Sequence, residues 1–271
     1  MINSADLKTP AALRTYVINL DRSTARWQQS CALLDAAGLD YERISGVDGL
    51  VLTDAERAMF RKWTSLVRYG WPMLNAHIAC ALSHRRALQR FLDSDATCAL
   101  ILEDDHAALP SIVRLLEQLI QSMPRDWTVV NLGHDSAKHL TFVTAIVDAG
   151  VPRNLMAAHD FPVRTTACLW SRRGAAQFME HSRLIYAPVD VILQDYSARA
   201  GGAFLLTPPP VLFRDISSDL ETINDTLRPA ASPRRLRKIA RVAVARLFTE
   251  VRNLRNLVHS LRNQRAYRKG R

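Results

Sequence analysis

Three acidic residues in a row follow a short, wholly apolar segment of the chain. Glu103, Asp104 and Asp105 come directly after residues 98–102, which we expect to form a strand buried on both faces. Adjacent carboxylates repel one another, and partial burial raises that cost. A divalent cation would relieve the repulsion, because Mg²⁺ and Mn²⁺ prefer carboxylate oxygens. The same acids could instead favour the positive end of a following helix, so both interpretations stand at this point.

In the first interpretation, Asp105 is the main ligand of a Mn²⁺ or Mg²⁺ ion, with Asp104 and Glu103 as weaker candidates. His106 is either a fourth ligand or, more simply, an exposed neighbour. Ligands of parallel α/β sheets bind beyond the carboxyl ends of strands, where these acids fall. A metal there could hold a diphosphate and stabilise a leaving group. G-x-x-x-x-G-K-[ST] and G-x-G-x-x-G are absent, which argues against P-loop and dinucleotide-binding enzymes.

The elements that must position these acids alternate along the chain. This alternation predicts an α/β domain with a mostly parallel central sheet. Ser23 and Gly38 would begin and end one helix, and Thr53-x-x-Glu56 forms a capping box that opens another. We predict strands at 16–20, 41–45, 98–102, 128–132, 166–170 and 204–206, and helices at 24–37, 76–92, 110–122, 172–182 and 188–199.

Charge divides the chain into a domain, residues 1–227, and a basic helical tail, residues 228–271. The tail holds 14 of the 36 Lys and Arg residues and one of the 26 acids, so it carries +13 and the domain −3. An anionic membrane surface, a nucleic acid or an acidic partner would suit such a tail. Valines and mostly leucines repeat there with heptad spacing, namely Ala240, Val244, Leu247, Val251, Leu254, Val258 and Leu261.

Three arrangements of this tail remain open. It could lie on anionic lipid with its arginines among the headgroups. It could form a dimeric coiled coil, in which Glu250 meets Arg255 of the second copy. It could also pack as an amphipathic helix on its own domain.

The cysteines and the N-terminus bear on the compartment. None of the cysteines forms a C-x-x-C pair, and their apolar surroundings predict free buried thiols and a reducing compartment. Residues 1–6 lack a charged segment followed by an apolar one, so we expect no signal peptide, and no apolar stretch nears the roughly 20 residues that span a bilayer. We therefore expect a cytoplasmic protein, peripheral at the inner face of the cytoplasmic membrane. The cysteines are Cys31, Cys80, Cys98 and Cys168.

Six segments in consistent order carry a family resemblance. They are 16–26 (YVINLDRSTAR), 41–49 (YERISGVDG), 78–84 (IACALSH), 101–105 (ILEDD), 165–175 (TTACLWSRRGA) and 188–190 (PVD). Together they resemble glycosyltransferase family 25, which includes bacterial lipooligosaccharide galactosyltransferases, over about residues 14–215. Two departures stand out: Ala76-His77 replace the usual Gly-Glu, and Cys168 replaces an aromatic residue.

The resemblance implies a GT-A-like, Rossmann-type fold and a metal-dependent hexosyltransferase that inverts the anomeric carbon. UDP-galactose is the commonest implied donor, and the acceptor would be a glycolipid, a growing lipooligosaccharide or lipopolysaccharide core. Two alternatives remain: a catalytically inactive member that binds sugar nucleotide or glycan, and a nucleic-acid-binding protein acting through the tail. The acidic domain carries no nucleic-acid motif, so no nucleic acid is expected.

The resemblance also suggests roles for particular residues. The nucleotide and diphosphate would meet the residues after the first strand, with arginine as a bidentate partner. Asp48 and Gly49 would shape the pocket, although a tight turn alone would explain the glycine. Either Glu103 or Asp104 could meet the ribose or the sugar, and Ser83 and His84 the sugar or the diphosphate. The predicted donor-binding residues are Asn19, Asp21, Arg22, Arg26, Asp48, Gly49, Ser83, His84, Glu103 and Asp104.

An inverting transfer needs a base that deprotonates the acceptor hydroxyl. Asp190 is the first candidate, because Pro188 at a helix start would place it near the ligand edge of the sheet. Asp195 is the second candidate and Asp135 a third. Capping of the helix N-terminus would explain Asp190 equally well.

Overall fold

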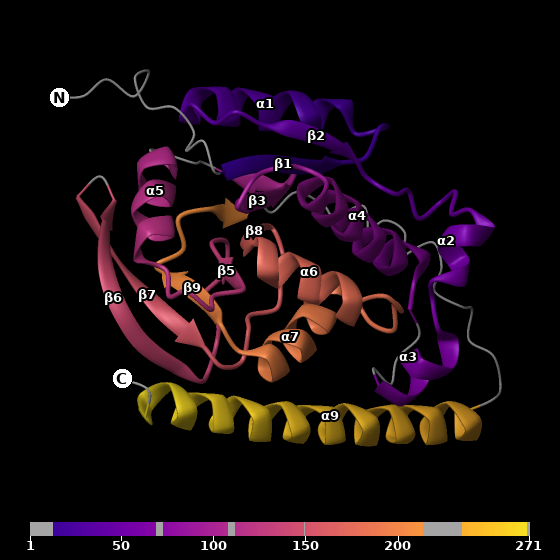
Figure 1. The fold of residues 1–271 in the computed structure, drawn as a ribbon. Helices are drawn as coiled ribbons and strands as arrows, with labels where there is room; N and C mark the ends of the chain where they lie inside the picture. The colour runs from indigo at the N-terminus through magenta and orange to yellow at the C-terminus, as the bar shows by residue number, and fades with distance from the viewer. Residues whose placement is uncertain (1–12, 69–72, 108–111, 149, 214–234, 270–271) are drawn as a thin grey trace.

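A mixed eight-stranded sheet forms the centre of the molecule (Figure 1). The computed structural model describes residues 13–68, 73–107, 112–148, 150–213 and 235–269. The strand order is β2-β1-β3-β8-β5-β9-β7-β6, and β4 pairs separately with β10. The strands are β1 (Leu13–Asn19), β2 (Glu42–Ser45), β3 (Cys98–Glu103), β4 (His106–Ala107), β5 (Val129–Asn131), β6 (Leu140–Asp148), β7 (Val151–Ala158), β8 (Ala167–Ser171), β9 (Ala203–Thr207) and β10 (Leu212–Phe213).

Helices cover both faces of this sheet (Figure 1). On one face lie α1 (Thr24–Ala37) and α5 (Ile112–Ser122). On the other lie α4 (Asn75–Leu92), α6 (Arg172–His181) and α7 (Val189–Ala200). The remaining helices of the described residues are α2 (Asp54–Ala58), α3 (Lys62–Arg68) and α9 (Arg235–Lys269).

The predicted α/β class is confirmed, but the sheet is less parallel than predicted. β1 runs parallel to both β2 and β3, and β5 runs parallel to β9. β8 lies antiparallel between β3 and β5, and the β6–β7 hairpin adds two antiparallel strands beside β9. The parallel trio β2-β1-β3 is the part that carries the acids, so their predicted place at strand ends holds.

The central strands carry runs of consecutive apolar residues because both of their faces are covered. Tyr16 and Ile18 of β1 pack with α4, α6 and α7, whereas Val17 between them packs with α1 and α5. In β3, Ile101 and Leu100 divide between the same two clusters. Successive strand side chains point to opposite faces, so a strand buried on both faces shows a continuous apolar run.

Local sequence sets the C-terminal end of α1 and the start of α2. α1 ends at Gly38, the predicted end of this helix, and Gly38 adopts a left-handed conformation with φ 69°. Thr53 and Glu56 form the predicted capping box of α2. The α5 helix is confirmed from Ile112, whereas its predicted start at Pro110 falls outside the described residues.

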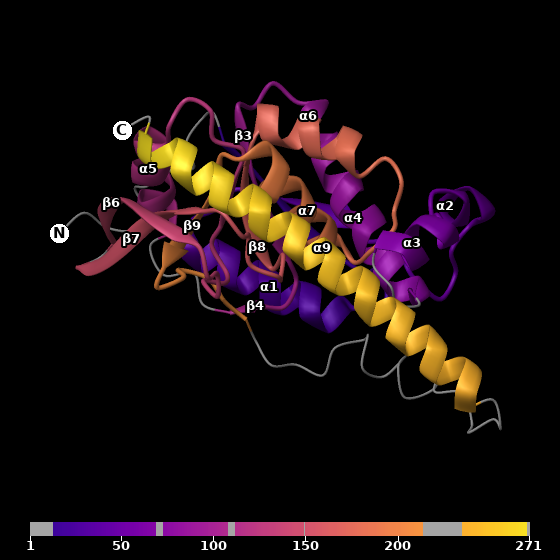
Figure 2. The same ribbon diagram turned by 90° about the horizontal axis from the view of Figure 1, so that it is seen from below.

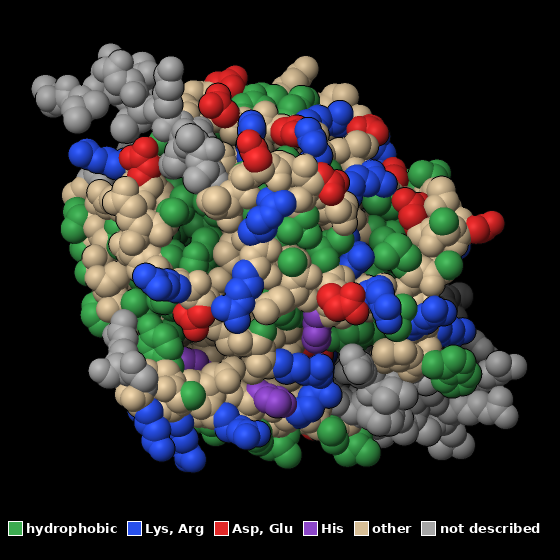
Figure 3. All heavy atoms as spheres, viewed as in Figure 1, with side chains coloured by type: hydrophobic (Ala, Val, Ile, Leu, Met, Phe, Trp, Pro, Cys, Tyr) green, Lys and Arg blue, Asp and Glu red, His purple; other side chains and the backbone are tan. Residues whose placement is uncertain are grey.

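The basic tail forms one long helix, α9, that packs on its own domain. It crosses the underside of the molecule, along α7 and α3 (Figure 2). Seen from the side, the lower edge where α9 lies shows Lys and Arg side chains next to hydrophobic ones (Figure 3). The helix thus contacts its own domain, as in the third predicted arrangement, although its leucines and valines from Leu247 to Leu261 stay exposed. Residues 228–234 fall outside the described chain.

None of the described helices combines the length and the apolar character that crossing a bilayer requires. The four cysteines are free. Cys98 and Cys168 are buried, as predicted, whereas Cys31 and Cys80 are partly exposed.

His159, directly after β7, links the sheet to α9 and should make stability depend on pH. It is 5% exposed, bonds Thr141 Oγ1 at 3.0 Å and packs edge-on against Tyr267 of α9. Burial lowers the pKa of His159 to about 4; Asp160 opposes this shift, and Arg268 and His139 reinforce it. In the unfolded chain this imidazole takes up a proton near pH 6.5, whereas in the folded chain it does so only near pH 4.

We expect the melting temperature to fall as the pH drops from 6.5 towards 4, and His159→Gln to reduce this slope. The sign follows because the folded pKa lies below the unfolded one, so this stabilisation is complete only above pH 6.5. Thermal melts at several pH values measure it, with His134→Gln, at a partly exposed site, as the matched control. An identical slope in wild type and His159→Gln would contradict this role.

Candidate functional site

A cleft opens where the carboxyl ends of β1 and β3 meet the N-terminal half of α4. It encloses about 760 Å³ of space, a figure that includes open solvent at its mouth. The loop after β2 forms one wall, and the acids after β3 lie at its inner end. The predicted site residues that line it are Asn19, Arg22, Arg26, Asp48, Gly49, Ser83, His84, Glu103, Asp104 and Asp105.

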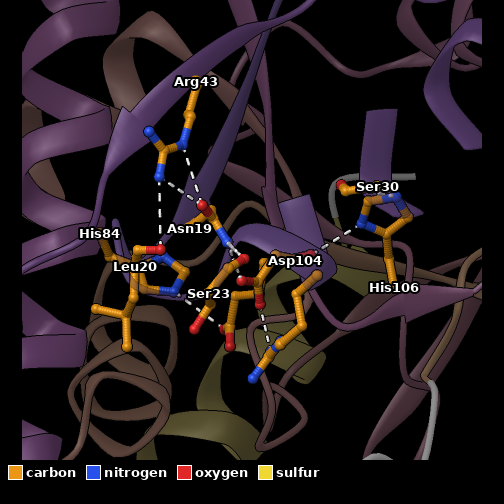
Figure 4. Close-up of polar contacts among 10 residues, drawn as sticks. Asn19, Leu20, Ser23, Ser30, Arg43, His84, Asp104 and His106 are labelled. Carbon is orange, nitrogen blue, oxygen red and sulfur yellow. Dashed lines mark hydrogen bonds and ion pairs between the residues drawn. The ribbon is translucent and has the colours of Figure 1, made fainter. Parts of the chain in front are cut away.

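Asn19, at the end of β1, ties three elements together and is 1% exposed. Its amide NH₂ donates to Asp104 Oδ2 at 2.6 Å and to the Ser23 carbonyl at 3.1 Å. Its Oδ1 accepts two hydrogen bonds from the Arg43 guanidinium, at 3.0 and 2.7 Å. Figure 4 shows Asn19 between Arg43 and Asp104. Asn19 therefore fixes the first two strands against the acids after β3.

Asp104 is the acid that the protein itself neutralises. Its second oxygen accepts a hydrogen bond from Arg26 of α1, which also pairs with it as an ion. Burial raises the pKa of Asp104, against the lowering effects of Asn19 and Arg26. Because both of its oxygens hold protein partners, Asp104 positions the strand ends and suits a bound ion less well than Asp105 does.

Glu103 is held ionised by two neighbours. Its Oε1 accepts a hydrogen bond from Thr165 Oγ1 at 2.7 Å and lies 3.1 Å from His84 Nε2. Burial alone would raise the pKa of Glu103, but these contacts and the charge of Arg26 bring it below its usual value. A fixed negative charge therefore lies on the α4 side of the cleft.

Asp105 is the acid with an unsatisfied oxygen. Its Oδ1 is buried and makes no hydrogen bond. Burial, followed by repulsion from Glu103, raises the pKa of Asp105 to about 7. A buried polar atom without a partner is costly and calls for an explanation such as a missing ion. A bound cation would supply the missing partner and remove the repulsion.

The donor atoms in the cleft fit a divalent metal. Cys80, His84 and Glu103 each offer one ligand atom, and these atoms lie within 4.8 Å of one another. Cys80 and His84 are four residues apart and so share one face of α4. Burial raises the pKa of the Cys80 thiol, which leaves it neutral and a weak ligand for hard ions. The carboxylates of Glu103 and Asp105 are the better match for Mn²⁺ or Mg²⁺.

The outer wall of the cleft is held by short polar contacts. Arg22 Nε donates to Asp48 Oδ2 at 2.8 Å near the mouth. The pKa of Asp48, which burial would raise, is lowered overall by Arg22 and by the Leu50 backbone N–H. Ser83 is 3% exposed; its Oγ accepts from the Val47 N–H at 2.8 Å, which holds this wall against α4.

Gly49 lets the loop after β2 lie close against the start of α4, which is why a glycine stands there. A Cβ at Gly49 would lie 2.8 Å from the backbone N and Cα of Ala76, at the start of α4. Next to it, His77 Nδ1 accepts the Leu74 N–H at 3.3 Å, the contact that a glutamate makes in a capping box. The His77 departure from the family pattern thus retains the capping of α4.

Two residues near the acids lie elsewhere than predicted. Asp21 does not line the cleft; its side chain is 69% exposed and bonds Ser45 and Arg43. His106 is 0% exposed rather than an exposed neighbour. Its Nδ1–H donates to the Glu103 carbonyl at 2.9 Å and its Nε2 faces Ser30 Oγ at 3.4 Å, so both nitrogens are engaged.

The structure separates the candidate bases. Asp195 is 0% exposed, bonds Tyr186 and Asn256 beneath α9 and does not line the cleft, which argues against it as the base. Asp135 accepts a hydrogen bond from Thr207 at the carboxyl end of β9 and does not line the cleft. Asp190 is partly exposed in the first turn of α7, where it accepts the Val191 N–H. Burial and the charge of Glu103 raise its pKa, as a base requires.

The sequence did not point to three residues of this site. Cys80 could have been found from its i, i+4 spacing to His84 on an expected helix. Thr165 and Arg43 fall inside family-like segments, but their contacts with Glu103 and Asn19 bridge distant parts of the chain. No local pattern reveals such contacts.

Comparison with known proteins points to one family. Residues 12–193, more than half of the chain, match the family model "Glycosyltransferase family 25 (LPS biosynthesis protein)". A "Glycosyltransferase 25 family member" of Aedes aegypti is 27% identical over 187 residues, 65% of this chain and 29% of its own. Another of that title, from Anopheles gambiae, is 33% identical over 94 residues, 33% of this chain and 16% of its own. The chain thus spans less than a third of either relative.

Proposed function

The chain belongs to glycosyltransferase family 25, and on that premise we propose that it transfers galactose from UDP-galactose to a lipooligosaccharide or lipopolysaccharide acceptor, with inversion. The observation that carries this proposal is the cleft itself. An acid with an unpartnered oxygen, Asp105, lies beside a fixed carboxylate, Glu103, at the carboxyl ends of two parallel strands. That is where α/β sheets bind nucleotides.

The donor would lie along the cleft with its diphosphate towards the acids. Glu103 and Asp105 would hold a Mn²⁺ or Mg²⁺ ion, which supplies neutralisation of the charge that develops on the departing diphosphate. Arg22, partly exposed near the mouth, would bind a phosphate oxygen. Asn19 and Arg26 keep Asp104 in place and thereby orient the acids on either side of it.

The transfer is a single displacement. The acceptor hydroxyl oxygen forms a bond to the anomeric carbon while the bond from that carbon to the diphosphate oxygen breaks, which releases UDP and inverts the centre. The hydroxyl proton passes to a base, for which we propose Asp190. Burial raises the pKa of Asp190 and makes it a stronger base, and it interacts electrostatically with Glu103 at the cleft.

The identity of the acceptor rests on the family, whose description names LPS biosynthesis. The His77 contact favours an active enzyme over an inactive binding protein, because the departure from the family pattern still caps α4 beside the cleft. A cytoplasmic enzyme at the inner membrane face would meet such an acceptor during its synthesis.

A donor screen tests this function. We expect the full chain to release UDP from UDP-galactose in the presence of Mn²⁺ and an acceptor core saccharide, faster than from other UDP-hexoses. Chelation by EDTA should stop turnover and added Mn²⁺ should restore it. Coupled UDP detection measures the rate. Binding of UDP-galactose without any turnover would instead identify an inactive family member, and turnover unchanged by EDTA would refute the metal assignment.

A further inference from the structure

The long C-terminal helix, α9, turns an apolar side to solvent and a mostly polar side to the domain. Helices on a domain surface normally bury their apolar side and expose their polar side. From Leu247 onward, the leucines and valines of α9 that the structure describes are exposed. Their exposed fractions run from 37% to 63%, in Leu247, Val251, Leu254, Leu257, Val258 and Leu261.

The side of α9 that meets the domain is mostly polar, with Tyr267 as an apolar contact. Asn256 is 8% exposed and donates to Asp195 Oδ1 at 2.6 Å. Asn263 donates to the Ala198 carbonyl at 2.8 Å, and Ser260 is 0% exposed. Specific hydrogen bonds thus hold the helix in one rotation about its axis, with the apolar stripe turned away from the protein.

The stripe is straight and continues into basic side chains. Spacings of four and three residues place Leu247, Val251, Leu254, Val258 and Leu261 along one side of the helix. The next positions of that side, Arg265 and Arg268, are exposed, as are Arg262 and Lys269 beside them. Within residues 235–269 the sequence holds 11 Lys and Arg and one acid, Glu250.

We propose that this outward side of α9 binds an anionic lipid surface. An apolar stripe flanked by arginines suits insertion to the depth of the acyl chains, with the guanidinium groups among phosphate headgroups. The docked polar side would keep the catalytic domain outside the bilayer. Unlike a free tail, a helix already ordered on its domain loses little conformational freedom on binding.

A second copy of the chain fits this surface less well. Two copies of α9 would bring two strongly basic helices together, and like charges repel. The predicted coiled coil would pair Glu250 with Arg255 of the second copy. The Arg255 guanidinium instead lies 3.7 Å from Asp195 of its own chain. Nucleic acid would satisfy the arginines but leave the apolar stripe exposed.

Vesicle sedimentation of the full chain tests this proposal. We expect binding to phosphatidylcholine vesicles containing about 30% phosphatidylglycerol and little binding to phosphatidylcholine alone. The double variant Leu254→Gln, Val258→Gln should bind at least about tenfold more weakly. Val147→Gln, Val151→Gln, which changes exposed valines of the β6–β7 hairpin, is the matched control and should bind like wild type.

Other outcomes would overturn it. Sedimentation equilibrium without lipid should show a monomer; a dimer that the Leu254→Gln, Val258→Gln variant dissociates would assign the stripe to a second copy. Equal binding by wild type and that variant would show that the stripe has no part in membrane binding. Affinity for duplex DNA but none for anionic vesicles would assign α9 to nucleic acid. Circular dichroism and melting of each variant would confirm that it folds.

Discussion

Asp105→Asn is expected to lower kcat for sugar transfer by about 10²–10³-fold, the scale on which the loss of one electrostatic stabiliser acts. The amide has nearly the shape of the carboxylate but removes the charge that would hold the ion. It also removes the repulsion with Glu103 that raises the pKa of Asp105. The variant should therefore melt at the same temperature as wild type or higher, while turnover is lost.

This combination of results separates a catalytic role from a structural one. A residue needed only for folding would lose activity and stability together. Asp95→Asn, whose side chain is 94% exposed before β3, serves as the matched control and should keep wild-type turnover and melting. Full turnover of Asp105→Asn at saturating donor would contradict the proposal that Asp105 binds the metal ion.

Asp195→Ala is expected to destabilise the protein by about 3–5 kcal/mol, as the loss of one partner of a buried ion pair does. Asp195 is 0% exposed, with Arg255 and Arg252 of α9 at 3.7 and 4.0 Å. Without it, the buried amide of Asn256 loses its acceptor and Arg255 loses a nearby carboxylate. Urea denaturation measures the loss, and tryptic cleavage within α9 should become faster.

Its control is Glu180→Ala. Glu180 pairs with Arg183 at 4.0 Å, but both side chains are more than 70% exposed, so the change should stay within about 0.5 kcal/mol. Asp195→Asn should keep the contact with Tyr186 and retain turnover, since Asp195 lies outside the cleft. Loss of turnover by a stable Asp195→Asn protein would restore it as a candidate base.

The sequence predicted best where burial leaves a simple pattern. The continuous apolar run before Glu103 and the helix limits at Gly38 and Thr53 agree with the structure to within a residue or two. Ten of the predicted residues line one cleft. They come from segments that meet at the carboxyl ends of neighbouring strands, where α/β sheets bind ligands.

The failures share a physical cause, which is that the deciding contacts are not local. Strand direction depends on where the chain returns, so β8 could not be recognised as antiparallel. A register shift at Phe142 and the exposed Val147 and Val151 break the alternation that would reveal β6 and β7. The role of Asp195 depends on Asn256, 61 residues further along the chain.

The antiparallel position of β8 has a consequence for synthesis on the ribosome. β3 and β5 are not joined to each other; both hydrogen-bond to β8, which is made after them. Until residues 167–171 emerge, the growing chain carries an open strand edge next to the future cleft, and such edges recruit other strands. A truncation before Ala167 should therefore aggregate, whereas one that removes only α9 leaves every pairing of the central sheet intact.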